Sequence, residues 1–268
     1  MMSADMSVDS SLDIIKSMKI AANGATFTAP INVKDGDVEI EGAKLVASAA
    51  SATAKDNAPA VKVTGDGDFT LVNSTISGTS RTGISLGTTG KITVSGNTFE
   101  AGSKSIYNAI EFSIGDSAAD ISHAVIKGNT FKGTLGNNAI SLYNLADGAE
   151  VFVEDNNFKD FSVDNNCVRL SNPKNASATF NLVGNKYNFT SETPNADGYT
   201  AFLLLQDYSK KGADKQDFSK FTIHVKNLTR GGHKIAAKGE GIDKAYYVYS
   251  DQDGILADGI NDPVVDFA

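Results

Sequence analysis

The sequence contains no tryptophan, one cysteine and three histidines, and each shortage excludes a class of site. One cysteine, Cys167, cannot build an intrachain disulfide framework, and its place in a small-residue position predicts a packed, unreactive thiol. His123, His224 and His233 lie far apart without ligand-like spacing, so we expect no metal site and no bound cofactor. No apolar run approaches the length of a membrane span, so we expect no contact with a membrane.

Basic residues are also few relative to acidic ones. The chain has 24 Lys and Arg against 32 Asp and Glu, a formal net charge of −8. Nucleic acid binding needs clustered basic residues, so nucleic acid is not an expected partner. Residues 1–9 contain acids but neither a basic segment nor an apolar run. We therefore expect no secretory signal peptide, and synthesis in the cytoplasm.

The sequence contains a repeated motif, here called the phrase, that occurs seven times. One half is a small residue followed by alternating apolar positions, and its copies begin at Ala60, Gly83, Ala109, Ala139, Cys167, Ala201 and Ala245. The other half ends in Asn, one further residue and an aromatic, as in Gly96-Asn97-Thr98-Phe99 and Gly128-Asn129-Thr130-Phe131. A repeat of this kind indicates a solenoid.

The apolar residues of each phrase alternate with period two, which predicts short strands with one buried face. A single turn of such strands cannot bury its apolar side alone, so successive turns stack on one another. We predict an all-β, right-handed parallel β-helix of about seven coils. The repeated polar and aromatic positions are expected to form a structural ladder along it: Asn97, Asn129, Asn156, Asn185, Phe99, Phe131, Phe158 and Tyr187.

Three segments follow from this pattern: residues 1–23, the β-helix over 24–250, and a tail over 251–268. Leu12, Ile15 and Met18 have the spacing of one helix face, which predicts a short N-terminal helix. Such a helix caps the open end of a solenoid, or docks onto a larger particle. The tail either folds back over the last coil or reaches a neighbouring subunit.

The Gly-Asn-Thr-Phe phrase at 96–99 and 128–131 resembles the parallel β-helix repeat of the pectin-lyase-like superfamily, and the resemblance covers about residues 24–250. That superfamily contains polysaccharide lyases, glycoside hydrolases, adhesins, and bacteriophage tailspikes and other virion proteins. The resemblance therefore implies the fold and does not choose a function. Viral members are often trimeric, which implies a homotrimer as one form of assembly.

Glu111 and Arg169 are the best catalytic candidates. They share an outward column of the first strand with Ser141 between them, so two strand spacings, about 9.6 Å, separate them. This is too far for an ion pair and close enough to flank a substrate. No column shows the paired carboxylates of a glycosidase or the acidic cluster of a calcium-dependent lyase. A solvated face is the alternative interpretation, and we prefer it.

A second candidate region is the charged, glycine-containing insertion over residues 206–218, expected to be an exposed loop. Loops that project from a rod often carry its specificity. Its candidate binding residues are Tyr208, Lys210, Lys211 and Asp214.

Three functions are consistent with these features. The first is a non-enzymatic structural protein of a bacteriophage virion: a capsid decoration, fibre or tail component that is located in the virion and binds other virion proteins or further copies of itself. The second is a polysaccharide-degrading, tailspike-like lyase or glycosidase that depends on Glu111 and Arg169. The third is a surface adhesin that binds a host glycan. The missing export signal argues against this third function.

Overall fold

The structure is a computed structural model of the chain. It describes residues 11–52, 57–102, 105–112, 120–161, 166–189, 201–207, 216–234, 246–250, 255–256 and 264–267. Throughout these residues the secondary structure is β-strand, with turns and bends between strands and no helix. The prediction of an all-β chain is therefore confirmed for the described residues.

The strands form three parallel arrays, which we name sheets A, B and C. Sheet A contains β3 (Thr26–Phe27), β6 (Lys44–Ser48), the first part of β9 (Thr75–Leu86), β11 (Thr98–Ala101), β14 (Thr130–Gly133), β17 (Asn157–Phe161), β20 (Lys186–Phe189), β23 (Thr229–Arg230) and β24 (His233–Lys234). Sheet B contains β1 (Leu12–Ile14), β4 (Ile31–Val33), β7 (Val61–Val63), the second part of β9, β12 (Ile106–Phe112), β15 (Ile140–Leu142), β18 (Val168–Leu170), β21 (Leu203–Asp207), β25 (Tyr246–Ser250) and β26 (Ile255–Leu256). Sheet C contains β2 (Met18–Ala21), β5 (Val38–Glu41), β8 (Phe69–Val72), β10 (Ile92–Ser95), β13 (Ile121–Lys127), β16 (Leu145–Glu154), β19 (Ala178–Val183), β22 (Phe221–Lys226) and β27 (Val264–Phe267).

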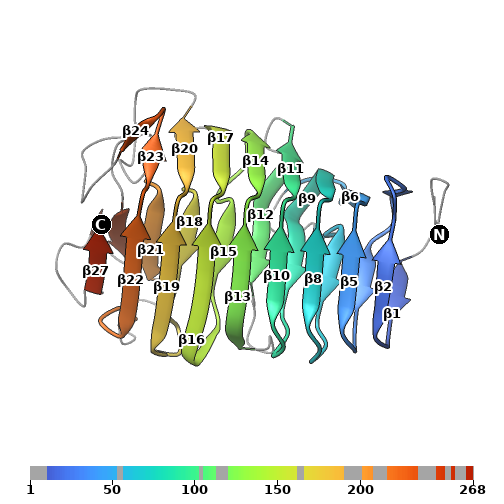
Figure 1. The fold of residues 1–268 in the computed structure, drawn as a ribbon, viewed down its shortest axis with the longest axis horizontal. Coiled ribbons are helices and arrows are strands. Elements are labelled where there is room, and N and C mark those ends of the chain that lie inside the picture. The colour runs from blue at the N-terminus through green and yellow to red at the C-terminus, as the bar shows by residue number, and fades with distance from the viewer. Residues whose placement is uncertain are drawn as a thin grey trace.

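The chain visits sheets B, C and A in turn and then starts again one strand further along. Each strand therefore pairs in parallel with the strand one turn later, as β5 pairs with β8 and β8 with β10. Sheet C is the clearest row in Figure 1, from β2 near the N-terminus to β27 near the C-terminus. The arrangement is a parallel β-solenoid. The antiparallel pairs are β23–β24 and β25–β26, both toward the C-terminal end.

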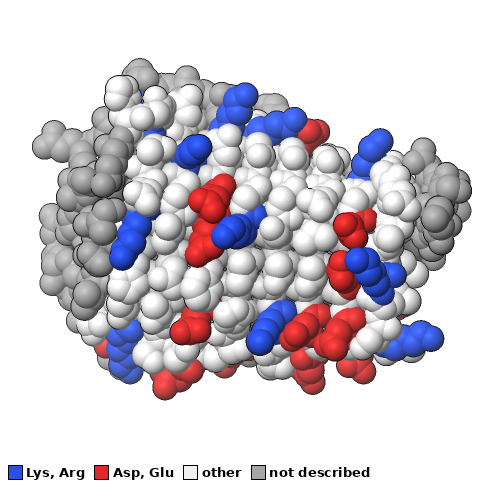
Figure 2. All heavy atoms as spheres, viewed as in Figure 1, with Lys and Arg blue, Asp and Glu red and all other residues white. Residues whose placement is uncertain are grey.

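The register of sheet C aligns equivalent residues into straight outward columns. The central column contains Lys19, Glu39, Thr70, Thr93, Val125, Phe152, Asn181 and His224. Figure 2 views this face: charged side chains gather mainly toward its edges, with one mixed group over the middle strands. Period-two alternation in the sequence therefore sets which residues face outward.

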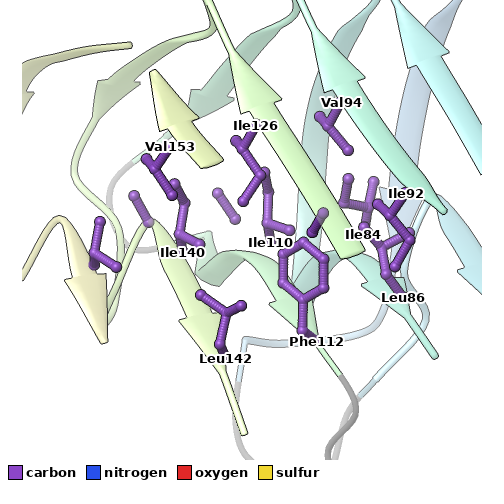
Figure 3. Close-up of a cluster of buried hydrophobic side chains, with 14 of the residues drawn as sticks. Ile84, Leu86, Ile92, Val94, Ile110, Phe112, Ile126, Ile140, Leu142 and Val153 are labelled. Carbon is purple, nitrogen blue, oxygen red and sulfur yellow. The ribbon is translucent and has the colours of Figure 1, made fainter. Parts of the chain in front are cut away.

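The core lies between the three sheets and is filled by the other residue of each alternating pair. Figure 3 shows Ile84, Ile110 and Ile140 from sheet B facing residues of sheet C such as Ile126 and Val153. All five side chains are fully buried. Each turn thus buries one apolar stripe against its own other strands and against the adjacent turns.

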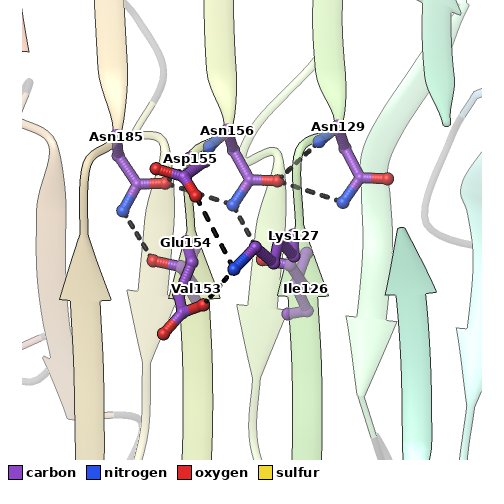
Figure 4. Close-up of polar contacts among 8 residues, drawn as sticks. All are labelled: Ile126, Lys127, Asn129, Val153, Glu154, Asp155, Asn156 and Asn185. Atoms are coloured by element: carbon purple, nitrogen blue, oxygen red, sulfur yellow. Dashed lines mark hydrogen bonds and ion pairs between the residues drawn. The ribbon is translucent and has the colours of Figure 1, made fainter. Parts of the chain in front are cut away.

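Asn97, Asn129, Asn156 and Asn185 form a buried ladder at the corner between sheets C and A. The side-chain oxygen of Asn156 accepts hydrogen bonds from the backbone N–H (2.9 Å) and the carboxamide (3.0 Å) of Asn129. Each carboxamide also donates to a carbonyl of the preceding turn, as Asn185 does to Val153 (Figure 4). Polar groups at a buried corner are thereby satisfied by the turn stacked upon it.

The left-handed residue of each corner is the one before the ladder asparagine. Gly96, Gly128 and Gly184 have φ of 67°, 64° and 69°, and Asp155 takes this place with φ 54°. Glycine, asparagine and aspartate adopt this conformation most readily. The Gly-Asn dipeptide therefore has two separate tasks, one for the backbone bend and one for the ladder.

The aromatic residues that follow the asparagines stack inside sheet A. The rings of Phe99 and Phe131 are 4.8 Å apart and 12° from parallel, and those of Phe131 and Phe158 are 4.9 Å and 6°. Tyr187 continues the column and is 1% exposed. Phe202 packs beside the column, with its ring 5.9 Å from that of Phe158 and nearly perpendicular to it, and 5.8 Å from that of Tyr187.

The predicted N-terminal helix is wrong. Leu12 and Ile14 belong to β1, which pairs with β4, and Met18 begins β2, which pairs with β5. The spacing of Leu12, Ile15 and Met18 fits a helix, but apolar and polar residues also alternate within this segment. The next turn of the solenoid supplies parallel strands, β4 and β5, whose backbones pair with it. Ile15 lies between the two strands and is 68% exposed. Among the described residues, the first strand of the solenoid thus begins at Leu12, within the segment expected to be a cap.

Two details of the repeat also differ from expectation. Phe202, and not Ala201, takes the small-residue position, because Val168 pairs with Leu203 and its N–H donates to the Phe202 carbonyl. Within the described residues, sheet C has nine strands, two more than the seven phrases. The last of these, β27, lies within the segment expected to be a tail and pairs with β22.

Candidate functional site

The predicted catalytic candidates lie in one column on neighbouring strands of sheet B. Glu111 on β12 is in register with Ser141 on β15, and Ser141 is in register with Arg169 on β18. Their neighbours Ile110 and Ile140 point into the core, so these three residues stand on the outward side. All three are nevertheless buried: Glu111 is 4% exposed, Ser141 0% and Arg169 4%. The column is therefore a covered polar cluster and not the solvated face that we preferred.

The Glu111 carboxylate is held by groups of its own and the preceding turn. Its Oε2 accepts hydrogen bonds from the Thr82 hydroxyl at 2.6 Å and from the Asn108 carboxamide at 3.0 Å. Its Oε1 lies 3.8 Å from Nη2 of Arg81. A buried carboxylate is stable only when such donors replace its hydration. Glu111 therefore serves as an acceptor that joins three neighbouring groups.

The Arg169 guanidinium turns toward the serine between the two candidates. Its Nη2 donates a hydrogen bond to the Ser141 hydroxyl. Glu111 and Arg169 thus contact different partners on the same face, and each of them bonds to a residue one turn earlier: Glu111 to Thr82, and Arg169 to Ser141. The column thus carries an acidic and a basic side chain, and Thr82, Asn108 and Ser141 are among their hydrogen-bond partners.

A second column of asparagines, at the start of the sheet B strands, was missed by the sequence analysis. Asn108, Asn138 and Asn166 are each at most 1% exposed. The Asn138 backbone N–H donates to Oδ1 of Asn108 (3.2 Å), and that of Ala201 donates to Oδ1 of Asn166 (3.0 Å). The signal was present, because each asparagine directly precedes the small residue of the phrase.

The predicted binding residues Tyr208, Lys210, Lys211 and Asp214 lie outside the described residues. The residues that flank them are firmly attached to the solenoid. Asp207 ends β21 and is 4% exposed, and Gln216 is 5% exposed. Asn172 binds this second flank: its N–H donates to Oε1 of Gln216 (2.5 Å) and its carboxamide donates to the carbonyl of Asp217 (2.6 Å).

Ion pairs on the outer surface connect adjacent turns. Lys127 on β13 pairs with Glu154 on β16, with Nζ 3.0 Å from Oε2, and Asp155 lies 3.7 Å from the same Nζ (Figure 4). Hydrogen bonding to Glu154 raises the pKa of Lys127 above its ordinary value. Lys19 is likewise shared by Glu39 and Glu41, at 2.8 and 3.1 Å. Exposed pairs of this kind contribute little stability each and set charge along the rod.

A hollow of about 390 Å³ lies at the N-terminal end of the solenoid. Its apolar lining comes from Leu12, Ile14, Met18 and Ile20, on the first strands of sheets B and C. Met18 is 38% exposed there. In the part of the chain that the structure describes, β1 pairs with β4 only and β2 with β5 only.

Comparison with protein-family models, with curated proteins and with solved structures gives no match. Within the described ranges, no group of three or more His, Cys, Asp or Glu residues is placed to hold a metal ion. The same residues include no helix long and apolar enough to cross a membrane. The class that the geometry defines is a parallel β-solenoid with a covered polar cluster on sheet B.

Proposed function

We propose that this chain is a right-handed parallel β-helix and acts as a non-enzymatic structural protein, a rigid rod that holds its ends and loops at fixed positions. The observation that carries this proposal is the uninterrupted pairing of sheet C from β2 to β27, reinforced by the asparagine ladder. The right-handed sense is supported by the general rule that parallel strands in one sheet are joined by right-handed crossovers, in about 98% of cases.

The contacts of the acid and the base on sheet B support a structural role for them. Glu111 is satisfied by Thr82 and Asn108, and Arg169 is bonded to Ser141, so both groups stabilise the stacking of turns. A general acid or base must instead reach a substrate atom within hydrogen-bond distance. At 4% exposure, neither side chain is presented to a polymer lying on the rod.

The setting that we propose is a bacteriophage virion, with other virion proteins or further copies of the chain as partners. What supports it is the resemblance of the Gly-Asn-Thr-Phe phrase to viral β-helix proteins, together with a fold whose stability increases along its length. The test is mass spectrometry of washed particles from the source lysate, with stoichiometry measured against the major capsid protein. We expect many copies per particle, and absence from washed particles would overturn the setting while leaving the rod in place.

A polysaccharide-degrading enzyme is the alternative that the cluster on sheet B favours, because it places an acid and a base in one column. The direct test is cleavage of host surface polysaccharides by the wild-type chain and by Glu111→Gln, a variant that keeps the shape of the side chain. We expect no cleavage by either protein. Cleavage by the wild type that disappears in Glu111→Gln, with an unchanged circular dichroism spectrum, would establish the enzyme instead.

A glycan-binding adhesin is the third candidate. What favours it is the attachment of the residues on either side of the candidate segment, because Asp207 and Gln216 are buried and Gln216 accepts a hydrogen bond from Asn172. Glycan-array binding by the wild type, lost when Lys210 and Lys211 are replaced by alanine, would support this function. We expect no such binding.

A further inference from the structure

Three Asp-Gly dipeptides occur among the described residues, where the chain enters sheet C. Asp35-Gly36 and Asp66-Gly67 precede β5 and β8, and Asp147-Gly148 lies near the start of β16. Glycine has no side chain to shield its backbone nitrogen, so this nitrogen can approach the carboxyl group of the preceding aspartate. A reaction between two groups of one chain is fast when the reacting atoms are held about 3–3.5 Å apart. Identical dipeptides therefore differ in reactivity through their surroundings.

The Asp35 carboxylate is placed against the nitrogen atom that can attack it. The Gly36 N–H donates a hydrogen bond of 2.7 Å to Oδ1 of Asp35, so the carboxyl carbon, one bond away, lies beside the same nitrogen. Among the hydrogen bonds of the described residues, this is the one that the Gly36 N–H makes. Asp35 is also exposed, so water reaches the site. Both reacting groups are thus close together and accessible.

Asp147-Gly148 has a similar backbone but different contacts. The φ of Gly148 is 77° and that of Gly36 is 79°, and Asp147 is exposed as Asp35 is. The Gly148 N–H, however, donates to the carbonyl of Ser177 at 2.9 Å, one turn later. Oδ1 of Asp147 accepts hydrogen bonds from the Ser177 N–H (2.9 Å) and hydroxyl (2.7 Å), which lower the pKa of Asp147 and keep it ionised. The next turn therefore holds the nitrogen and the carboxylate apart from each other.

We propose that Asp35 is a site of spontaneous isomerisation, at which the native protein acquires an isoaspartate. The Gly36 nitrogen forms a bond to Cγ of Asp35, and the protonated carboxyl group loses its OH, which leaves as water with the N–H proton. This step closes a succinimide ring. Water then adds to the main-chain carbonyl carbon of the ring and breaks its bond to the Gly36 nitrogen. The chain now runs through the side-chain carboxyl of Asp35, and no atom is gained or lost overall.

The product does not fit the corner in which it forms, because isoaspartate places one more methylene in the backbone. A Cβ on Gly36 would already lie 2.3 Å from the backbone nitrogen of Ser17 in the preceding turn. The Asp37 N–H donates to the Ser17 hydroxyl at 2.9 Å, a contact that needs the same close approach. We therefore expect isomerisation to loosen the stacking of β1 and β2 on β4 and β5.

The same criterion ranks two further dipeptides. Asn23-Gly24 can form the same ring by loss of ammonia, but the Gly24 N–H donates to the carbonyl of Gly42 at 2.7 Å. We expect its deamidation to be slower in the native protein than in the unfolded chain. For Asp66, none of the hydrogen bonds within the described ranges joins its carboxylate to the Gly67 N–H. We expect its rate to lie between those of Asp35 and Asp147.

Peptide mapping of the full chain after prolonged incubation tests the proposal, with fragmentation that distinguishes isoaspartate from aspartate. In the native protein, isoaspartate at position 35 should form at least about tenfold faster than at position 147, because Gly148 must first break its hydrogen bond to the next turn. In guanidinium chloride, which removes the fold, the two positions should react at similar rates. Equal rates in the native protein, or a preference for position 35 that persists in the denaturant, would overturn the proposal.

Asp35→Glu is the matched variant, because it keeps the charge and makes the ring larger and slow to close. It should abolish the isomer at position 35 and leave the rate at Asp147 unchanged. Hydrogen exchange then measures the structural consequence, since the other Asp-Gly dipeptides are the same in both proteins. After ageing, the amides of residues 12–21 should exchange faster in the wild type than in Asp35→Glu. Equal exchange in the two aged proteins, with isoaspartate present at position 35, would show that the corner accommodates the longer backbone.

Discussion

Asn97 donates two hydrogen bonds to one oxygen atom of Asn129. The backbone N–H of Asn97 is 2.9 Å from Oδ1 of Asn129, and its carboxamide nitrogen is 3.1 Å from the same atom. Asn129 and Asn156 repeat the arrangement, as do Asn156 and Asn185. Each asparagine side chain therefore accepts hydrogen bonds from the backbone N–H and the carboxamide of the asparagine one turn earlier. Because these groups are buried, the ladder couples the stability of each turn to its neighbour.

Replacing Asn129 with leucine should strongly destabilise the fold. The variant removes the acceptor of the Asn97 N–H and the donor to the Val94 carbonyl, which lies 2.8 Å from the Asn129 carboxamide. Buried groups that lose their partners cost about 1–3 kcal/mol each, so we expect a loss of about 3 kcal/mol in the free energy of unfolding. Urea denaturation measures it. Asn157→Leu, at an exposed outward position, is the control and should change stability by less than about 0.5 kcal/mol.

The aromatic column should be equally sensitive at its middle member. Phe131 is fully buried and stacks on Phe99 and Phe158. Phe131→Ala should reduce the free energy of unfolding by about 3–5 kcal/mol, because it leaves a cavity between two rings. Tyr107→Ala, at a residue that is 36% exposed, is the control. Equal losses in the two variants would show that the column is not a source of stability.

The strands and columns could be predicted because the repeat has one dominant period. The alternation of apolar and polar residues indicates that Thr93 and Lys127 face outward from sheet C. In the structure, Thr93 is in register with Val125 and Lys127 with Ser95, the residues at equivalent positions of the repeat. The phrase also located the ladder asparagines, since a side chain recurring once per turn must stack on its equivalent. Local pattern and tertiary stacking agree in this region, so the sequence is informative about both.

The N-terminal segment and the cluster on sheet B could not be predicted for two different reasons. Leu12, Ile15 and Met18 satisfy a helical spacing, and only the edge of the next turn decides in favour of strands. Glu111 occupies an outward position whose burial depends on residues remote in sequence, such as Thr82. Alternation tells which way a side chain points, but it does not tell what covers it.

Two glycines should respond very differently to alanine. A Cβ on Gly67 would lie 2.2 Å from the carbonyl oxygen of Gly36 in the turn below, so the stacked turns must separate. A Cβ on Gly128 would meet no atom within 4 Å, and the variant would only strain its φ of 64°. We expect a loss of about 1 kcal/mol for Gly128→Ala and a clearly larger loss for Gly67→Ala. A loss for Gly67→Ala no greater than that for Gly128→Ala would contradict the close stacking of these turns.

Cys167 should make the stability of the protein fall in alkaline solution. It is fully buried, and burial raises the pKa of its thiol well above the ordinary value of 9.0. In the unfolded chain the thiol ionises near that value, while the folded protein keeps it protonated. Above pH 9 the unfolded state therefore binds fewer protons than the native state, so the free energy of unfolding falls as the pH rises.

The Cys167→Ala variant isolates this contribution, because Ala139 already occupies the equivalent position one turn earlier. We expect the difference in unfolding free energy between pH 7 and pH 10 to be about 1.4 kcal/mol larger for the wild type than for the variant. Urea denaturation of both proteins at the two pH values measures it, and the titration of lysines and tyrosines cancels in the comparison. Parallel pH profiles, or rapid reaction of the native thiol with a disulfide reagent at pH 8, would mean that Cys167 is accessible to water and that the turn around it opens.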